Sequence, residues 1–325
     1  MRQPILVLGA NGFIGRRVIA ALAATDWAEA IALVRRSGAP PPGAVKQCVA
    51  DATASRAIRE ILGGMRAVVN CVAPEPRKIL PSVEALFDAV ESSKEDLRVV
   101  HLSSMAVYGS ATGLVDEKAA LRGDLGEYSV AKVAAEAVAC RHSRTVIFRP
   151  GCVYGPHSTQ WSVRFADYLL AHRLGDLGPA GDGYCNLVHV DDVAQAVVRA
   201  LENPQTDGGV YNLASPNPPT WNDYLIRYAR ALRAVPARRI SRRRLQIETK
   251  LLAPPLKIFE ILARACHLNP GRLPAPIPPS LGRLMCQEIR LSTVRAEQEL
   301  GMRWVDLEAG LNETARWILE SRKAA

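Results

Sequence analysis

Three glycines at three-residue spacing follow directly on an apolar run near the start of the chain. The run Pro4–Gly9 (PILVLG) is typical of a short buried strand, and Phe13–Ala24 has the apolar spacing of a helix. The glycines stand at positions 9, 12 and 15 between them. Such glycines permit a tight turn, a close approach of backbone to a pyrophosphate, and close packing of helix on strand. We therefore expect a dinucleotide-binding loop, with free N–H groups of the helix N-terminus facing the phosphates.

The first half of the chain continues this alternation of strands and helices. Further strands are predicted at Ala30–Arg35, Val45–Ala50, Ala67–Val72, Arg98–Ser103 and Thr145–Arg149, and helices at Ala54–Leu62, Val83–Glu91 and Leu125–Arg141. Repeated units of this size predict an α/β fold, a doubly wound parallel sheet with right-handed crossovers.

The pattern loosens after about residue 155. Later elements are predicted at Asn186–Val190, Asp192–Glu202, Val210–Leu213, Trp221–Arg233, Thr293–Leu300 and Leu307–Ser321. We expect residues 1–155 to form a dinucleotide-binding domain with contributions from about 184–215. Residues 156–325 are expected to form a smaller, mainly α-helical substrate-binding lobe.

Composition excludes several classes of protein. Of the 325 residues, 48% are apolar and 22% charged, which is ordinary globular composition and argues against a disordered chain. No apolar run reaches the ~18 residues of a membrane span, and the N-terminus lacks a cleavable signal pattern. The seven cysteines form no CxxC pair and have no zinc-ligand spacing. We therefore expect a cytoplasmic protein with reduced cysteines and no metal site.

The net charge of +9 is concentrated in one stretch. Residues 227–290 contain 14 Lys and Arg against 3 Asp and Glu, and the rest of the chain is slightly negative. This asymmetry fits a polyanion, an acidic membrane surface, a phosphorylated substrate, or simply a solvated basic face. Within it, Leu251–Met285 fits a lid over an apolar substrate, a contact with a membrane surface or, as we prefer, ordinary helices. Without aromatic interleaving we expect no nucleic-acid partner, and at most a weak peripheral membrane contact.

Arginines after the second predicted strand bear on the choice of cofactor. A fold selective for NAD usually carries Asp or Glu about twenty residues past the glycines, whereas this chain has Arg35 and Arg36. Arg35, with Arg16 in the first turn of the helix, favours NADP through a 2′-phosphate. The alternative is that Arg35 stacks on the adenine and either cofactor binds. Asp51 is predicted to bond the adenine amino group or to serve as a helix N-cap.

A tyrosine and a lysine are the candidate catalytic residues. Tyr128 and Lys132, in YSVAK, are four residues apart and share one face of a predicted helix. Tyrosine normally loses its proton near pH ~10, but a lysine cation one turn away favours the phenolate. Tyr128 can then take a proton from an alcohol or give one to a carbonyl. Ser104, or alternatively Ser103, ends a predicted strand at the edge where ligands bind, and its hydroxyl can polarise a carbonyl.

These motifs together carry a family resemblance. The segments GANGFIG, SSMAVYG, YSVAK, RPGCVYGP and HVDDVA occur in this order over roughly residues 3–215. The chain resembles an extended short-chain dehydrogenase/reductase of the NAD-dependent epimerase/dehydratase kind. The resemblance implies a Rossmann-type fold, a site of Ser104, Tyr128 and Lys132, hydride transfer at a nicotinamide, a small-molecule substrate and a homodimer. The cofactor-binding residues it implies are Gly9, Asn11, Gly12, Phe13, Ile14, Gly15, Arg16, Arg35, Asp51, Ala52, Val72, Ala73, Tyr128, Lys132 and Pro150.

Departures from the family pattern bear on the reaction. The segment after the sixth strand has Gly151 and Cys152 where sugar-nucleotide enzymes typically place an asparagine, and Met105 follows the serine where dehydratases place an acid. We therefore predict an NADP(H)-dependent oxidoreductase that interconverts a carbonyl and an alcohol. The alternatives are an NAD-dependent sugar-nucleotide epimerase and a non-catalytic dinucleotide-binding protein. Asp191 and Asp192 are interpreted not as an acid–base pair but as a helix start, with Asp191 as the N-cap.

Overall fold

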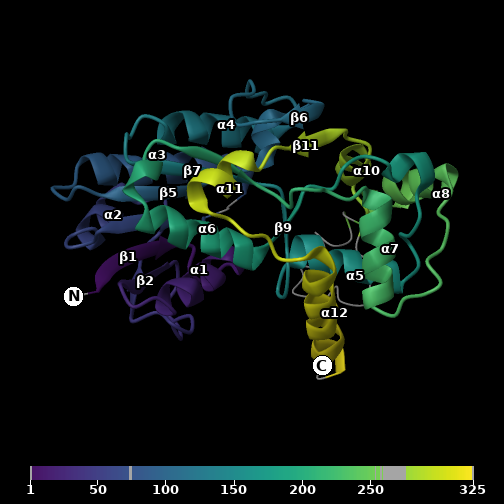
Figure 1. Ribbon diagram of the computed structural model, residues 1–325, viewed down its shortest axis with the longest axis horizontal. Coiled ribbons are helices and arrows are strands. Elements are labelled where there is room, and N and C mark those ends of the chain that lie inside the picture. Colours follow the sequence, from purple (N-terminus) through teal and green to yellow (C-terminus); the bar gives the residue numbers. More distant parts are fainter. Residues whose placement is uncertain (1, 73–74, 253, 257, 259–275, 324–325) are drawn as a thin grey trace. The chain divides into compact units, whose positions relative to one another are not determined.

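The computed structural model describes residues 2–72, 75–252, 254–256, 258 and 276–323 (Figure 1). The chain divides into two compact units. Unit 1 contains Met1–Val153, Val188–Pro216 and Leu291–Val305, and unit 2 contains Tyr154–Leu187, Asn217–Arg290 and Asp306–Ala325. The sequence placed residues 291–305 in the C-terminal lobe, whereas they belong to unit 1, because Ala296, Leu300 and Met302 pack into its core.

Unit 1 is built on a seven-stranded sheet. Its strands are β1 (Gln3–Leu8), β2 (Ala28–Val34), β3 (Lys46–Val49), β4 (Ala67–Asn70), β5 (Arg98–Leu102), β7 (Thr145–Pro150) and β10 (Val210–Leu213). All are parallel and lie in the order β10-β7-β5-β4-β1-β2-β3. The chain runs outward from β1 in both directions, since Leu8 is in register with Leu33 on one side and Asn70 on the other. The predicted doubly wound, Rossmann-type fold is confirmed.

Helices cover both faces of this sheet (Figure 1). On one face α1 (Phe13–Ala23), α6 (Val190–Glu202) and α11 (Val294–Leu300) contribute to one apolar core. On the other face α2 (Ser55–Ile61), α3 (Pro76–Glu91) and α4 (Glu127–Ala139) enclose a second core. The strands are apolar on both sides because each of their faces is buried under helices.

Several short elements lie in unit 1 or where the chain passes from one unit to the other. They are the 3₁₀ turns η1 (Met105–Tyr108) and η4 (Pro204–Thr206) and the strands β6 (Gly113–Val115), β8 (Cys152–Tyr154), β9 (Leu187–His189) and β11 (Ile289–Leu291). Two-stranded sheets pair β6 with β11 and β8 with β9. Helix α3 begins seven residues before the predicted start at Val83, because Pro76 suits its first turn and Ile79 is buried in the core.

Unit 2 is mainly helical. Its elements are η2 (Thr159–Val163), α5 (Arg164–Leu170), η3 (Gly178–Gly181), α7 (Trp221–Ala231), α8 (Arg242–Gln246), η5 (Ile247–Leu252), α10 (Pro279–Met285) and α12 (Leu307–Lys323). Aromatic rings make its core: Phe165 packs against Trp221 and Tyr224 at centroid distances of 5.7 Å. The predicted apolar segment Leu251–Met285 lies partly outside the described residues. Among the described helices none is long and apolar enough to cross a bilayer.

Candidate active site

The glycine loop lies between the end of β1 and the start of α1. The Gly12 N–H donates to the Gly9 carbonyl oxygen at 2.8 Å, which closes the turn. Gly12 caps α1 without a side chain, and within the described chain the N–H groups of Phe13, Ile14 and Gly15 have no acceptor. Asn11 is exposed at the turn. Free N–H groups at the positive end of a helix are the chemistry that binds a phosphate, so the loop fits the pyrophosphate of a dinucleotide.

Backbone packing explains why glycine stands at two of these positions. A Cβ atom added at Gly15 would lie 2.2 Å from the Gly9 carbonyl oxygen, so a side chain there would force α1 away from the loop. Gly9 has φ +74°, and a Cβ there would lie 3.0 Å from the backbone of Cys71 at the end of β4. The loop is therefore packed closely against the first turn of α1 and the end of β4, which leaves its outer side to the phosphates.

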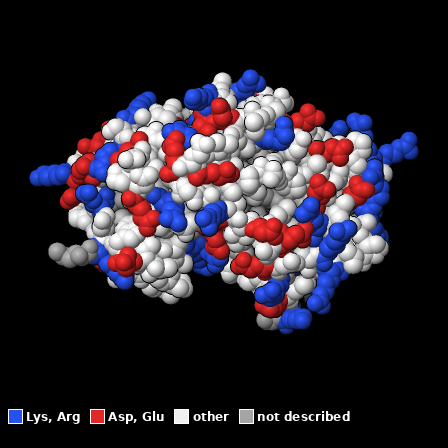
Figure 2. Space-filling model, in the orientation of Figure 1, with Lys and Arg blue, Asp and Glu red and all other residues white. Residues whose placement is uncertain are grey.

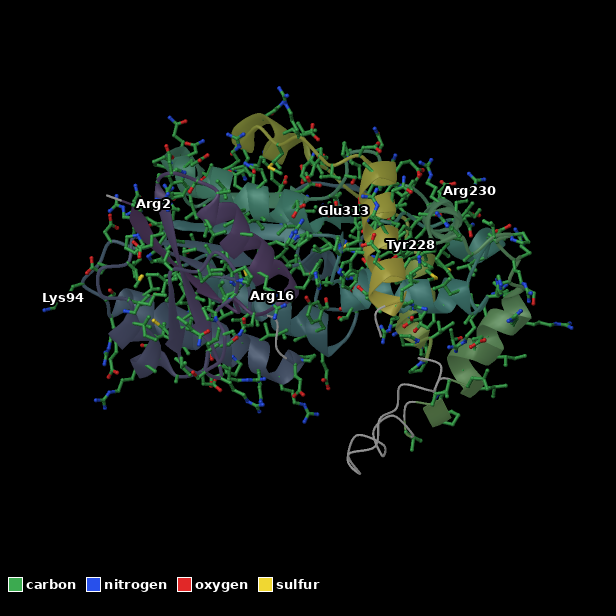
Figure 3. All side chains as sticks on the ribbon, turned by 90° about the horizontal axis from the view of Figure 1, so that it is seen from below. Arg2, Arg16, Lys94, Tyr228, Arg230 and Glu313 are labelled. Carbon is green, nitrogen blue, oxygen red and sulfur yellow. The ribbon has the colours of Figure 1, made fainter. Side chains whose placement is uncertain are left out.

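Cations stand beside this loop. Arg16, in the first turn of α1 (Figure 3), is exposed, as are Arg35 and Arg36 directly after β2. No ion pair engages any of the three in the described part of the chain. Exposed guanidinium groups without a carboxylate partner are suited to a phosphate.

Asp51 lies just after β3 and is not the N-cap of α2. Its Oδ1 accepts hydrogen bonds from the Thr53 backbone N–H at 2.9 Å and the Thr53 hydroxyl at 2.7 Å, and α2 is capped by Ala54 without a side-chain bond. The prediction of an N-cap is therefore wrong: Asp51 stands three residues before the actual N-cap, Ala54, and forms a local turn instead. The Thr53 bonds, with the charges of Lys78 and Arg35, hold the pKa of Asp51 below its ordinary value.

The remaining residues expected at the cofactor are spread along the same sheet. Ala52 and Val72 are half-buried in the segments that follow β3 and β4. Pro150 is the buried last residue of β7, in register with Leu213 of β10. Ala73 lies outside the described residues.

The two serines that directly follow β5 have different surroundings. Ser103 is buried, and its hydroxyl donates to Glu136 Oε2 at 2.7 Å. Ser104 is half-buried and caps η1, where its Oγ accepts the Ala106 N–H at 3.2 Å. Because Ser104 accepts this bond, its hydroxyl hydrogen can still be donated to another group. The hydroxyl hydrogen of Ser103 is already donated to Glu136. Of the two alternatives, Ser104 has the available donor.

Tyr128, in the first turn of α4, meets this serine. A hydrogen bond with Ser104 acts to lower the pKa of Tyr128, but burial outweighs it and the pKa lies above the ordinary value of 10.0. Tyr128 as a whole residue is 40% exposed, so part of it is accessible to a ligand. In the protein without cofactor Tyr128 is therefore protonated at neutral pH and can act as a proton donor.

Lys132 follows one helical turn later and is almost fully buried. Its Nζ donates to the Leu102 carbonyl oxygen at 2.9 Å and lies 6.0 Å from the centroid of the Tyr128 ring. Burial lowers the pKa of Lys132 to about 8, and the negative charge of Glu136 partly opposes this shift. The predicted Tyr–Lys pair thus shares one face of α4, and Ser104 joins it from the end of β5.

Beneath the site lies a buried polar network that sequence reasoning missed. Arg149 Nε donates to both oxygens of Glu136, at 3.0 and 3.2 Å, and its Nη1 donates to the Tyr108 hydroxyl at 2.8 Å. Tyr108 in turn donates to Asn212 Oδ1 at 2.6 Å. The charge of Glu136 is thereby paired, as a buried carboxylate requires. The spacing of Glu136 four residues after Lys132 was the available sequence signal.

Ser129 was also missed and fastens the start of α4. Its hydroxyl is 2.7 Å from the Ala106 carbonyl oxygen of η1 and 3.1 Å from the Arg122 carbonyl oxygen. The residue beside Tyr128 is thus bound to the turn that Ser104 caps. This contact fixes the tyrosine and the serine relative to one another.

The His189–Asp192 segment has a structural role in unit 1. The N-cap of α6 is His189, whose Nδ1 accepts the Asp191 N–H at 3.4 Å, so the prediction of Asp191 as the cap is wrong. Asp191 instead pairs with Arg17 of α1, with Nε to Oδ1 at 2.5 Å. Asp192 points elsewhere and accepts the Val305 N–H at 3.1 Å, as expected of adjacent residues on a helix.

Comparison with known proteins assigns the family. The model of the NAD dependent epimerase/dehydratase family matches residues 5–214, which is more than half of the chain. The chain belongs to this family. It is an extended short-chain dehydrogenase/reductase, as the motifs and the sheet order indicate.

Curated relatives are identical to the chain at about a quarter of the aligned positions. A 2′-dehydrokanamycin reductase of Streptomyces kanamyceticus is 27% identical over 240 residues, which are 70% of this chain and 66% of the relative. A ceramide reductase of Caulobacter vibrioides is 26% identical over 208 residues, 62% of each chain. A chloroplastic epimerase family protein of Arabidopsis thaliana is 26% identical over 240 residues, 67% of each chain. The chain thus spans about two thirds of these relatives.

Solved structures share the fold over nearly the whole chain. UDP-glucuronic acid 4-epimerase from Bacillus cereus in complex with NAD has a TM-score of 0.75 at 18% identity and covers 99% of this chain and 98% of its own. MoeE5 in complex with UDP-glucose and NAD has a TM-score of 0.70 at 21% identity, covering 98% and 99%. At such low identity the likeness concerns the fold alone.

Proposed function

We propose that this protein is an NADP(H)-dependent oxidoreductase that interconverts a carbonyl and an alcohol on a small-molecule substrate. The observation that carries the proposal is the meeting of Ser104 and Tyr128 at the carboxyl end of β5, with the Lys132 ammonium 6.0 Å from the tyrosine ring centroid. When bound, the nicotinamide cofactor donates or accepts the hydride.

In the reducing direction, the side chains act on the carbonyl oxygen. The Ser104 hydroxyl donates a hydrogen bond to this oxygen and polarises the carbon. The Tyr128 hydroxyl gives its proton to the same oxygen as negative charge develops there. The raised pKa of Tyr128 suits this direction, since the group is protonated before the reaction. In the oxidising direction the phenolate takes the proton from the alcohol.

Lys132 supports the proton transfer electrostatically. A cation near the ring stabilises the phenolate that remains after Tyr128 has given up its proton. The Nζ atom is held by the Leu102 carbonyl oxygen at 2.9 Å, so the charge is fixed in place before the reaction. We further assign its remaining N–H donors to the ribose that carries the nicotinamide.

The arginines favour NADP over NAD. Arg16 and Arg35 are exposed beside the glycine loop, and the described chain gives neither an ion pair. A 2′-phosphate would supply the missing anion. Asp51 lies nearby without excluding this, because its carboxylate is engaged by Thr53 and is 2.7 Å from the threonine hydroxyl.

Reductases among the curated relatives support the carbonyl–alcohol reaction. The second candidate is an NAD-dependent sugar-nucleotide epimerase, which is favoured by structural neighbours bound to NAD and a UDP-sugar. The two differ in what the cofactor does. A reductase exchanges its cofactor in every turnover, whereas an epimerase retains it and returns the hydride.

The first test identifies the cofactor. The purified protein is denatured, any released nucleotide is identified, and the empty protein is titrated with NADPH and NADH by fluorescence. We expect no retained NAD and tighter binding of NADPH. In Arg35→Asp the preference should fall by about tenfold or more, since a charge-assisted contact to the phosphate is replaced by repulsion. The matched control is Arg2→Asp. Arg2 is also exposed, but it stands directly before β1, at the end of that strand away from the glycine loop.

The second test concerns turnover with a panel of carbonyl compounds. Tyr128→Phe should lower kcat by about 10²–10⁴-fold while NADPH binding is kept, because only the proton donor is removed. Tightly retained NAD together with interconversion of UDP-sugars would replace this proposal by the epimerase. Full biological activity of Tyr128→Phe would instead favour a protein that binds a dinucleotide without catalysis.

A further inference from the structure

A helical segment of unit 2, Arg242–Leu252, has two contrasting faces. It consists of α8 and the wider π-turn η5 that continues it. Leu245, Glu248 and Thr249 are buried on one side, whereas most other side chains of the segment are exposed. The reaction proposed above uses none of these residues.

The buried side is fastened to the rest of unit 2. Arg173, after α5, donates from Nη2 to Glu248 Oε2 at 2.6 Å, and both side chains are buried. Arg244 donates to the His172 carbonyl oxygen at 3.2 Å. The segment therefore has a defined orientation within its unit, and its outer face is held outward.

This outer face is apolar along its centre. Ile247, Leu251 and Leu252 are 47%, 67% and 44% exposed. Leu251 and Leu252 follow Ile247 by four and five residues, which is about one turn of a π-helical segment. Three large aliphatic side chains exposed within six residues are unusual on a surface that meets only water.

Exposed arginines and a lysine belong to the same segment as these side chains. Figure 2 shows Lys and Arg gathered over α7 and α8. Within the segment Arg242, Arg243, Arg244 and Lys250 are exposed and have no carboxylate partner among the described residues. Between residues 227 and 258 the only acid is Glu248, which is buried and paired with Arg173. The face is thus basic as well as apolar.

We propose that the outer face of Arg242–Leu252 docks on an anionic phospholipid bilayer. The arginines and Lys250 would meet the lipid phosphates, and Ile247, Leu251 and Leu252 would enter the boundary between headgroups and acyl chains. A soluble polyanion or a nucleic acid explains the charge but leaves the exposed aliphatic side chains without a partner. The contact is peripheral, and it holds whichever reaction the protein catalyses.

The test uses the full chain and sedimentation with vesicles. We expect it to bind vesicles of phosphatidylglycerol and phosphatidylcholine in equal parts, not vesicles of phosphatidylcholine alone, and to dissociate at high salt. Arg242→Ala with Arg243→Ala should weaken binding about tenfold or more. Arg2→Ala with Lys94→Ala removes the same charge from exposed sites in unit 1 and should leave binding near the wild-type level.

A second variant tests the apolar part. Ile247→Gln with Leu251→Gln, which changes no charge, should weaken vesicle binding about tenfold or more, because aliphatic burial in the bilayer is lost. Circular dichroism and NADPH titration would verify that each variant is folded. The proposal is overturned if the wild-type chain does not bind the anionic vesicles. It is equally overturned if folded Ile247→Gln/Leu251→Gln binds them like the wild type, an outcome that would assign the face to a soluble polyanion.

Discussion

Glu136 is the residue through which the buried network acts on the candidate site. Its carboxylate pairs with Arg149, accepts the Ser103 hydroxyl, and raises the pKa of Lys132 against the effect of burial. It touches neither cofactor nor substrate in the proposed reaction and is therefore a positioning residue. Its effect should appear in the pH dependence of the reaction.

We predict that Glu136→Gln shifts the alkaline limb of the kcat/KM profile to lower pH. Without the negative charge the pKa of Lys132 falls below its value of about 8. The cation that stabilises the Tyr128 phenolate is then lost at a lower pH. The substitution also leaves Arg149 unpaired, at a cost of about 3–5 kcal/mol in the free energy of unfolding. The pH–rate profile is measured beside that of Glu84→Gln, an exposed glutamate on α3. An unshifted profile in a folded Glu136→Gln protein would refute the positioning role.

Asp192 carries a second buried charge, in the first turn of α6. Burial raises its pKa from 3.8 to about 6, and the hydrogen bond from the Val305 N–H opposes this only in part. Between these two pH values the folded state holds a proton that the unfolded state has released. The free energy of unfolding therefore falls as pH rises from about 4 to about 6.

We predict that Asp192→Asn removes this pH dependence. Relative to wild type, the variant should gain about 1–3 kcal/mol of unfolding free energy between about pH 4 and pH 7, because an amide still accepts the Val305 N–H but carries no charge. Urea unfolding of both proteins across this range measures the difference. A constant difference at all pH values would mean that Asp192 is already ionised in the folded protein at low pH.

At the scale of elements, the contact between α1 and the glycine loop decides whether a dinucleotide can bind. Gly15→Ala places a methyl group 2.2 Å from the Gly9 carbonyl oxygen, so α1 must move. We predict a loss of about 1–3 kcal/mol in stability and a large loss of NADPH affinity, since the N–H groups of the first turn move with the helix. Thermal unfolding and fluorescence titration measure these effects.

Gly63→Ala is the matched control, because among the described residues no atom beyond its chain neighbours lies within 4 Å of an added Cβ. It should leave both affinity and stability close to wild type. Equal affinity of Gly15→Ala and Gly63→Ala for NADPH would show that the loop does not bind the pyrophosphate.

At the scale of the whole molecule, we expect a homodimer that involves the start of α4. Leu125 and Val130 are 47% and 55% exposed on either side of Tyr128, and an exposed apolar surface of this kind is typical of an interface. Val130→Asp should convert the dimer to a monomer, as measured by light scattering. Val45→Asp, at a valine that is 62% exposed before β3, should remain dimeric. A wild-type monomer at high concentration would exclude the dimer.

Much of unit 1 could be predicted from the sequence because its signals are local. Apolar runs such as Pro4–Gly9 must be buried on both faces, and the helices between them have an apolar stripe that covers those faces. The glycines at 9, 12 and 15 and the Tyr128–Lys132 pair act over one or two turns of chain. Their relation to each other is therefore contained in the spacing.

The tertiary structure decided what depends on residues far apart in the chain. Ser104 rather than Ser103 has the free donor because Glu136, 33 residues after Ser103, accepts the Ser103 hydroxyl. The outward face of Arg242–Leu252 is likewise fixed by Arg173, 75 residues before Glu248. The sequence by itself determined the sheet, the glycine loop and the Tyr–Lys pair, since short-range periodicity specifies each. The tertiary structure decided which serine hydroxyl is free to donate, which residue caps α6 and which face of Arg242–Leu252 is exposed. Each depends on strand order and helix packing, because these determine the partners of buried polar groups.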